Sequence, residues 1–307
     1  YVYSANNQPD SINGNIYPGY YLPQNRAKRI TQLLDAKNDW DKESVSKMIT
    51  DVTSAVNPSV LKNFIAVLDE EKLGDQQKSA LVQLKKWNGE ATLESIEATI
   101  FHRWEYFFLR NTFQDELGED RFSQLMATHL LKRLIAPMSE KDNSVWWDNT
   151  STDQKETRAD IITTAFNQAF NSLESSLGVA YSKWTWNRVH TIEHPHPIGQ
   201  VEALREFFNV GPFAVNGTRE VINNMSFPYT EDGFYKVSSG PSTRRIIDFS
   251  DVENSISILP TGQSGNMFSP HYQDQAQMFV NGEFRKMMMN KEEIMETSKD
   301  KLLLKKL

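Results

Sequence analysis

The chain has 307 residues, a formal net charge of −7 and no cysteine. Its 39% hydrophobic and 24% charged residues are ordinary for a globular protein with a buried core. The acidic balance argues against nucleic acid as the main partner, because phosphate binding needs a basic surface. The missing cysteines exclude disulfides, thiolate metal sites and a cysteine nucleophile. No apolar run approaches the roughly 18–20 residues that span a bilayer, so no membrane segment is predicted.

Residues 1–25 predict a strand followed by a long loop. Tyr1 to Ser4 alternate like a strand already under way, and Asn13-Gly14 and Pro18-Gly19 are turn signals. A free domain seldom begins inside a strand, and no signal-peptide pattern precedes this one. We therefore expect Tyr1 to follow a processing or cleavage point.

Residues 26–180 predict a helical block, because apolar residues recur at helical spacing from Arg26 onward. Asn57 and Pro58 predict the start of one helix, as its cap and its first residue. The apolar stripe from Ile96 to Phe108 is predicted to be helix core rather than a ligand surface, since burial alone requires this spacing. After the first helix, the predicted helices cover residues 42–55, 58–70, 76–87, 93–117, 121–135 and 157–177.

Residues 181–307 predict a β-rich region that ends in a helix and a tail. Short strand-like runs at 246–249, 255–259 and 278–280 are separated by Pro, Gly, Asn and Asp. Residues 291–307 predict a charged helix and an apolar tail, Leu302–Leu304, that returns to the sheet. The predicted fold class is therefore α+β, with the helical block inserted between a first strand and the later strands.

Three histidines, His190, His194 and His196, share one face of an extended chain because side chains alternate along it. Three imidazoles on one face could hold zinc with an open position. Pro195 and Pro197 break regular strand geometry, however, and the spacing offers no fourth ligand. Structural histidines are the favoured interpretation, with a zinc site as the alternative.

The run Gly262-Gln-Ser264-Gly265 differs from the nucleophile elbow, which needs a glycine two residues after the serine. A triad of Ser264, His271 and Asp274 would have to form within one short loop. A Gly-rich turn that shapes a pocket wall is therefore favoured over a catalytic serine.

Arg244, Arg245 and Asp248 lie on a turn followed by a strand, as polar pocket residues or as surface charges. The sequence contains no phosphate-binding loop, dinucleotide fingerprint or EF-hand loop. The residues alone thus indicate an α+β chain with a polar, aromatic and Gly-rich C-terminal region.

The last third of the chain carries an ordered set of motifs. They are Gly240-Pro-Ser-Thr-Arg244, Ile247-Asp-Phe249, Leu259-Pro-Thr-Gly-Gln-Ser-Gly-Asn266, Ser269-Pro-His-Tyr272, Asp274-Gln275 and Gly282-Glu-Phe-Arg285. In order and spacing this set resembles the penicillin acylase family, which includes acyl-homoserine-lactone and cephalosporin acylases. The resemblance extends to Trp184–Pro197, Gly211–Gly217, Trp87-Asn-Gly89 and the opening Ala5-Asn6-Asn7.

The resemblance implies the C-terminal part of the β chain of an N-terminal-nucleophile hydrolase with αββα architecture. In such enzymes a precursor cuts itself in two, and the Ser exposed at the start of the β chain attacks the substrate amide. Its α-amino group serves as base, and a reference pKa of about 7.7–8.0 leaves neutral amine near working pH. Tyr1 has no aliphatic hydroxyl, so the resemblance places the nucleophile upstream, outside this chain.

The resemblance also assigns roles to two residues near the start of the chain. Asn6 stands where the family has the Asn whose side-chain amide donates to the oxyanion, and such an amide donates without proton transfer. Arg26 stands where the family has an Arg at a helix start. Its fixed charge would orient Asn6 and keep the α-amine neutral. From the residues alone, a turn Asn and a helix-surface Arg are the alternatives.

Two departures limit what is carried over from the family. Ala5 stands where some penicillin acylases carry Trp, so their acyl preference does not transfer. Relatives often bind calcium, but the loop Tyr17–Tyr21 offers no carboxylate. No cofactor or metal is therefore predicted in this chain. A calcium site in the complete enzyme would be formed by residues upstream of this chain. Asp248 stands where some relatives place an acid near the catalytic centre.

The implied function is hydrolysis of a carbon–nitrogen amide bond of the penicillin, cephalosporin or N-acyl type, in a periplasmic or exported enzyme. The implied partners are the missing N-terminal part of the β chain, the α chain of the same precursor and a small-molecule amide. The chain alone is expected to be inactive. The alternatives are an acyl-homoserine-lactone acylase and a non-catalytic binding or structural protein on a degenerate acylase scaffold.

Overall fold

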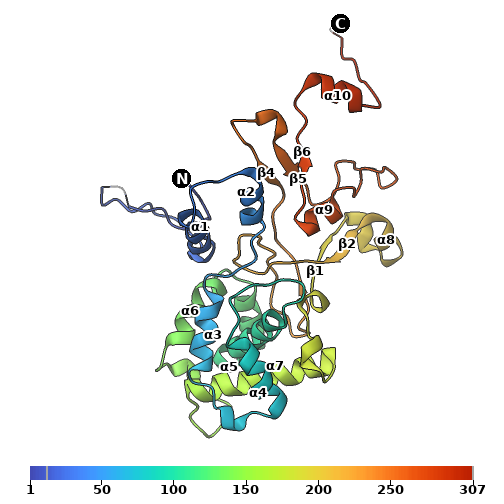
Figure 1. Ribbon diagram of the computed structural model, residues 1–307. Coiled ribbons are helices and arrows are strands. Elements are labelled where there is room, and N and C mark those ends of the chain that lie inside the picture. The colour runs from blue at the N-terminus through green and yellow to red at the C-terminus, as the bar shows by residue number, and fades with distance from the viewer. Residues whose placement is uncertain (12, 306–307) are drawn as a thin grey trace. The chain divides into compact units, whose positions relative to one another are not determined.

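The computed structural model describes residues 1–11 and 13–305, which form two compact units (Figure 1). Unit 1 comprises residues 1–38, 51–193 and 211–240. Unit 2 comprises residues 39–50 and 194–210 and the described chain from Pro241 onward. Each unit is therefore assembled from segments distant in sequence. The division into three successive parts, with boundaries after residues 25 and 180, stays a prediction.

Unit 1 is organised around one long helix, α5 (Ile96–Met126), against which α7 (Arg158–Leu177) packs (Figure 1). Every residue of α5 from Ala98 to Leu109 is buried, which confirms that the aromatic stripe is helix core. The Trp104 ring centroid lies 5.1 Å from that of Phe64 and 4.5 Å from that of Phe166. The other helices of this unit are α1 (Asn25–Asp35), α3 (Asn57–Ile65), α4 (Asp75–Leu84) and α6 (Leu131–Glu140).

Local signals account for several helix ends. Thr157 and Asp160 form a capping box at the start of α7, and Gly178 with φ 92° follows its last residue. Several expected boundaries were wrong. Val56 rather than Asn57 is the N-cap of α3, which ends at Ile65 rather than at residue 70, and the helix predicted over 42–55 ends at Ile49. The break predicted between helices 93–117 and 121–135 falls at Gly118, whose φ of 73° is non-helical and kinks α5. The second of these predicted helices is interrupted after Met126 and resumes as α6 at Leu131.

A three-stranded sheet completes unit 1, in the order β2-β1-β3. Its strands are β1 (His190–His194), β2 (Val210–Ala214) and β3 (Tyr235–Lys236). β1 and β3 are parallel, with His190 opposite Tyr235. A parallel pair requires a long connection, and here the segment between the two strands supplies residues that cover α5.

Unit 2 contains an antiparallel sheet in the order β4-β5-β6, formed by Arg244–Ile246, Ile256–Ile258 and Arg285–Lys286. Its helices are α2 (Lys42–Ile49), α8 (Arg205–Phe208), α9 (Ala276–Asn281) and α10 (Lys291–Thr297). Buried Arg244 donates to the carbonyl oxygen of Phe279 at 2.7 Å and lies 4.0 Å from its ring centroid. This contact joins the sheet to α9 and gives Arg244 a structural role.

Several strand predictions were wrong. Tyr1–Ser4 form no strand: their side chains are exposed, and the pairing near this end consists of isolated bridges such as that between Asn7 and Leu22. A segment with alternating side chains forms a strand only where a partner strand is available to pair with its backbone. The run 278–280 lies instead within α9, where Ala276 and Phe279 are buried three residues apart on one helical face. β4 ends at Ile246, and the predicted continuation through Phe249 is exposed.

The remaining regular structure is short. The 3₁₀ turns are Glu70–Lys72, Val145–Trp147, Tyr181–Lys183, Trp186–Arg188, Pro197–Gln200, Glu202–Leu204 and Val252–Asn254. Residues 298–305 follow α10 without helix or strand, and the end of the predicted tail at 306–307 lies outside the described residues. None of the helices in the described chain is long and apolar enough to span a bilayer. The mixture of helices and small sheets confirms the α+β class.

We expect Trp104→Ala to lower the free energy of unfolding by about 3–5 kcal/mol, because it removes a fully buried indole from the centre of the core. Urea unfolding followed by circular dichroism measures the change. Val145→Ala, at a side chain that is 80% exposed, is the control and should change stability by less than about 0.5 kcal/mol. Equal effects of the two substitutions would contradict the described core.

Candidate functional site

The structure brings Asn6 and Arg26 into direct contact. Arg26 is the second residue of α1, and its Nη2 donates to Asn6 Oδ1 at 2.5 Å and to the carbonyl oxygen of Ala5 at 3.0 Å. Ala5 is buried, whereas Asn6 is exposed. One guanidinium therefore holds both the side chain of Asn6 and the peptide that precedes it.

The backbone of Asn6 is held as well. Its φ is 61°, in the left-handed region that Asn tolerates better than most residues. Its carbonyl oxygen accepts a hydrogen bond from Leu22 N–H at 2.8 Å. The turn thus presents the Asn6 side chain outward while its backbone is held from the segment just before α1.

This geometry fixes which way the Asn6 amide points. A guanidinium only donates, so the atom next to Arg26 is the amide oxygen and the NH₂ group faces away from it. Among the described residues, the Asn6 NH₂ makes no hydrogen bond. The pair therefore offers an oriented, neutral N–H donor beside a permanent positive charge, as stabilisation of an oxyanion requires.

Asp248 lies in unit 2, whereas Asn6 and Arg26 lie in unit 1. Asp248 is partly exposed, and its carboxylate accepts hydrogen bonds from Ser250 N at 2.9 Å and from Ser250 Oγ at 2.6 Å. These bonds, chiefly the one from the hydroxyl, lower its pKa below the usual range. A local turn accounts for these contacts, and the catalytic role of Asp248 stays a prediction. Arg245 is an exposed residue of β4.

Two of the three histidines, His190 and His196, make separate structural contacts, and burial lowers the pKa of His194 below its ordinary value. His190 is fully buried, stacks on Trp186 at 4.7 Å between ring centroids, and hydrogen-bonds through Nδ1 to the carbonyl oxygen of Tyr235 at 2.7 Å. Burial lowers its pKa to about 3. His196 accepts from Ile198 N–H at 3.1 Å. Within the described chain no three His, Cys, Asp or Glu side chains converge as metal ligands, so the zinc alternative gains no support.

The Gly-rich loop of unit 2 behaves as a turn. Ser264 Oγ accepts from Asn266 N–H at 3.1 Å, and its backbone N–H donates to the carbonyl oxygen of His271. The His271 imidazole contacts Asp274 at 2.8 Å. The serine hydroxyl is thus engaged with its own turn, in agreement with the favoured interpretation. A Cβ on Gly262 would lie 1.9 Å from the His271 carbonyl oxygen, which explains the glycine.

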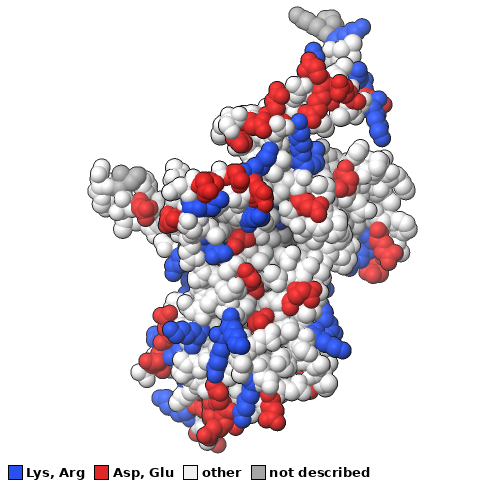
Figure 2. Space-filling view, in the orientation of Figure 1, with Lys and Arg blue, Asp and Glu red and all other residues white. Residues whose placement is uncertain are grey.

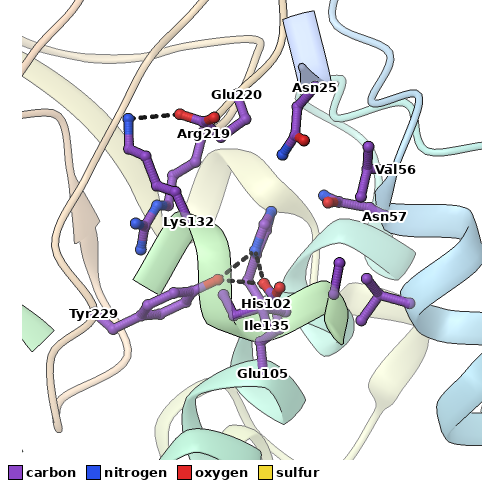
Figure 3. A pocket seen from close by; sticks show the side chains of 12 residues that line it. Asn25, Val56, Asn57, His102, Glu105, Lys132, Ile135, Arg219, Glu220 and Tyr229 are labelled. Atoms are coloured by element: carbon purple, nitrogen blue, oxygen red, sulfur yellow. Dashed lines mark hydrogen bonds and ion pairs between the residues drawn. The ribbon is translucent and has the colours of Figure 1, made fainter. Parts of the chain in front are cut away.

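Sequence reasoning missed a buried polar cluster in unit 1 (Figure 3). His102 Nδ1 lies 2.9 Å from Glu105 and 3.0 Å from the Tyr229 hydroxyl, and its Nε2 lies 2.7 Å from Thr218. The Tyr229 hydroxyl also donates to Glu105, and burial raises its pKa. The i, i+3 spacing of His102 and Glu105 was the available signal. Their partners lie more than one hundred residues away and could not be read from it.

A small cavity of about 40 Å³ borders this cluster. Its wall includes Asn25 at the start of α1 and the ion pair of Lys132 and Glu220, whose charged atoms lie 2.5 Å apart (Figure 3). Such a volume accommodates a few water molecules but no drug-sized ligand. The cluster and its cavity therefore act in the packing of unit 1.

Charge on the surface is mixed. On the face drawn in Figure 2, Lys and Arg side chains alternate with Asp and Glu. A continuous basic stripe, which nucleic-acid binding requires, is not formed by the described residues on that face.

The penicillin amidase family model matches residues 1–296. The chain belongs to the penicillin amidase family. This membership confirms the resemblance seen in the ordered motifs of the C-terminal third.

Several relatives found by sequence comparison share one name. The acyl-homoserine lactone acylase QuiP of Pseudomonas aeruginosa is 27% identical over 314 residues, covering 88% of this chain and 36% of the relative. The protein of the same name from Pseudomonas putida is 26% identical, covering 86% of this chain and 34% of the relative. The chain thus spans about a third of the length of these curated relatives.

A solved structure supports the fold. The thermostable penicillin G acylase of Alcaligenes faecalis aligns with a TM-score of 0.54 and 16% identity, over 97% of this chain and 55% of that chain. The chain therefore shares the fold of the matching part of this penicillin G acylase.

We expect Gly262→Ala to destabilise the protein by about 1–3 kcal/mol, because the added methyl group meets the His271 carbonyl oxygen. Gly265→Ala is the matched control from the same loop, since a Cβ there has no atom within 4 Å. Denaturant unfolding of both variants measures the difference. A Gly262 variant as stable as the Gly265 variant would contradict the described loop.

The buried His190 predicts a specific pH dependence of stability. Its folded pKa of about 3 lies below the ordinary value of 6.5, so between these values the unfolded chain binds one more proton. This proton uptake makes the free energy of unfolding fall as pH drops below about 6.5, by up to about 1.4 kcal/mol per pH unit.

The substitution His190→Asn should make the loss of stability between pH 6.5 and pH 4 less steep, as measured by urea unfolding at several pH values. His129→Asn, at an exposed histidine, should leave the slope unchanged. An unaltered slope in the His190 variant would show that His190 is not held neutral by burial.

Proposed function

We propose that this chain is part of an N-terminal-nucleophile amidase that hydrolyses a carbon–nitrogen amide bond, with the attacking Ser supplied from upstream of Tyr1. Family membership supports the reaction class. The observation that supports a contribution from this chain is the 2.5 Å hydrogen bond between Arg26 and Asn6 Oδ1, which orients the Asn6 NH₂ as a donor. Within this proposal, Asn6 is the oxyanion donor and Arg26 orients it.

The proposed reaction has two halves. The Ser hydroxyl attacks the amide carbonyl carbon while its α-amine takes the proton, and the new oxyanion accepts a hydrogen bond from Asn6. Collapse of this intermediate breaks the C–N bond, and the protonated amine returns the proton to the leaving nitrogen. Water then hydrolyses the acyl-enzyme ester by the same route. The positive charge of Arg26 favours the neutral, basic form of the α-amine.

The proposed substrate is a small N-acyl amide, of the penicillin or cephalosporin type or a related N-acyl compound. Acyl-homoserine lactone hydrolysis is the second candidate, favoured by the name that the Pseudomonas relatives carry. The proposed partners are the upstream part of the β chain and the α chain of the same precursor. A periplasmic or exported location and a calcium site outside this chain complete the proposal.

In the complete, self-processed enzyme, we expect Asn6→Ala to lower kcat about 100-fold with little change in KM, because one oxyanion donor is lost. Hydrolysis of p-nitroanilide amides measures both constants. Asn143→Ala, at an exposed loop residue, is the control and should retain full activity. Unchanged kcat in the Asn6 variant would remove Asn6 from the mechanism.

A second experiment separates the proposed substrates and tests whether the protein is an enzyme. The full precursor is expected to cleave itself ahead of a Ser and then to release product from penicillin G, a cephalosporin or an N-acyl homoserine lactone. The preferred member of this panel identifies the acyl class. A Gly or Ala at the processing point would instead favour a non-catalytic binding or structural protein on the acylase scaffold.

A further inference from the structure

One peptide group stands between α6 and the candidate oxyanion donor. The Tyr21–Leu22 peptide donates its N–H to the Asn6 carbonyl oxygen at 2.8 Å. The carbonyl oxygen of the same peptide accepts a hydrogen bond from Nη2 of Arg133, a residue of α6. The C=O and N–H of a trans peptide point in opposite directions, so Arg133 and Asn6 lie on opposite sides of it.

Arg133 also holds the residue before this peptide. Its guanidinium carbon lies 5.5 Å from the ring centroid of Tyr20, within cation–π range. Tyr20 is 65% exposed, and in the described residues between Asn7 and Leu22 no helix or strand forms. A long irregular loop retains considerable conformational freedom unless side chains anchor it. Arg133 therefore anchors the end of this loop, just before α1 begins, to α6.

Asn6 depends on such an anchor. Its φ of 61° is less favourable than a right-handed or extended conformation, so the surroundings must hold it. Arg26 holds the side-chain oxygen, and the Leu22 N–H holds the backbone oxygen. A charged donor on the Tyr21 carbonyl polarises the peptide and strengthens its N–H as a donor.

We propose that Arg133 is a positioning residue for the Asn6 amide and acts through the Tyr21–Leu22 peptide. The proposal rests on the proposed function, in which the Asn6 NH₂ donates to the oxyanion. Arg133 touches neither substrate nor Asn6. Its loss loosens the turn that aims the donor, and a displacement of the order of 1 Å at a catalytic group can cost up to about 100-fold in rate.

The test is a double-mutant cycle in the complete, self-processed enzyme, with Asn6→Ala, Arg133→Gln and the double variant. We expect Arg133→Gln to lower kcat about tenfold with KM nearly unchanged, and to lower it no further once Asn6 is Ala. Arg133→Lys, which retains a cationic donor, should recover part of the rate. Additive losses in the cycle, or a wild-type kcat in Arg133→Gln, would overturn the proposal.

Two further measurements distinguish a specific effect of Arg133 from the general loss of an arginine–backbone contact, and failure of this proposal from failure of the proposed function. Arg188→Ala is the control, because Arg188 is also an arginine that donates to backbone carbonyls, those of Leu177 and Lys183, and its loss should leave kcat unchanged. In Arg133→Gln, hydrogen exchange of the Leu22 amide should accelerate; unchanged protection would overturn the proposal. If Asn6→Ala alone leaves kcat intact, the proposed function fails, while faster Leu22 exchange would still show that Arg133 holds the turn.

Discussion

The burial of residues 98–109 of α5 on every side is the constraint on which unit 1 depends. A helix covered all round must satisfy each of its polar side chains internally, because an unpaired buried group is costly. Arg103 meets this requirement with hydrogen bonds to Ser172 and to the carbonyl oxygens of Thr230 and Glu231. His102 and Glu105 meet it through Thr218 and Tyr229. These contacts attach the segment 218–231 to the helix. Residues 102–105 of α5 thus fix the position of a segment that lies more than one hundred residues later in the sequence.

The candidate site depends on a different kind of contact, between charged side chains and the backbone. The Asn6 turn contains no regular structure of its own, and the cations of two helices hold it. Arg26 of α1 reaches it directly, and Arg133 of α6 reaches it through a peptide group. Because α6 packs against α3 and α5, the exposed turn is linked to the core of the helical unit. An exposed candidate donor can in this way be as well placed as a buried one.

The extent to which sequence could predict the fold varied with the element. Helical periodicity located α3, α4 and α7 to within a few residues, because burial of one face imposes the spacing. Short apolar runs were ambiguous, and the run 278–280 became helix because Ala276 and Phe279 face the core together. The strand expected at Tyr1–Ser4 lacked a partner among the described residues. Strand prediction fails in such cases because pairing is a non-local property.

By itself, the sequence determined the α+β class, the principal helices, the family and the identities of Asn6 and Arg26 as candidate residues. Each of these follows from local spacing or from the order of motifs along the chain. Only the tertiary structure decided that Arg26 bonds the Asn6 oxygen, so that its NH₂ points away from the guanidinium, and that His190 is a buried core residue. It also brought His102 and Glu105 to Tyr229. The physical reason is that a hydrogen-bond partner is chosen by the path of the whole chain, which the residues within one turn do not encode.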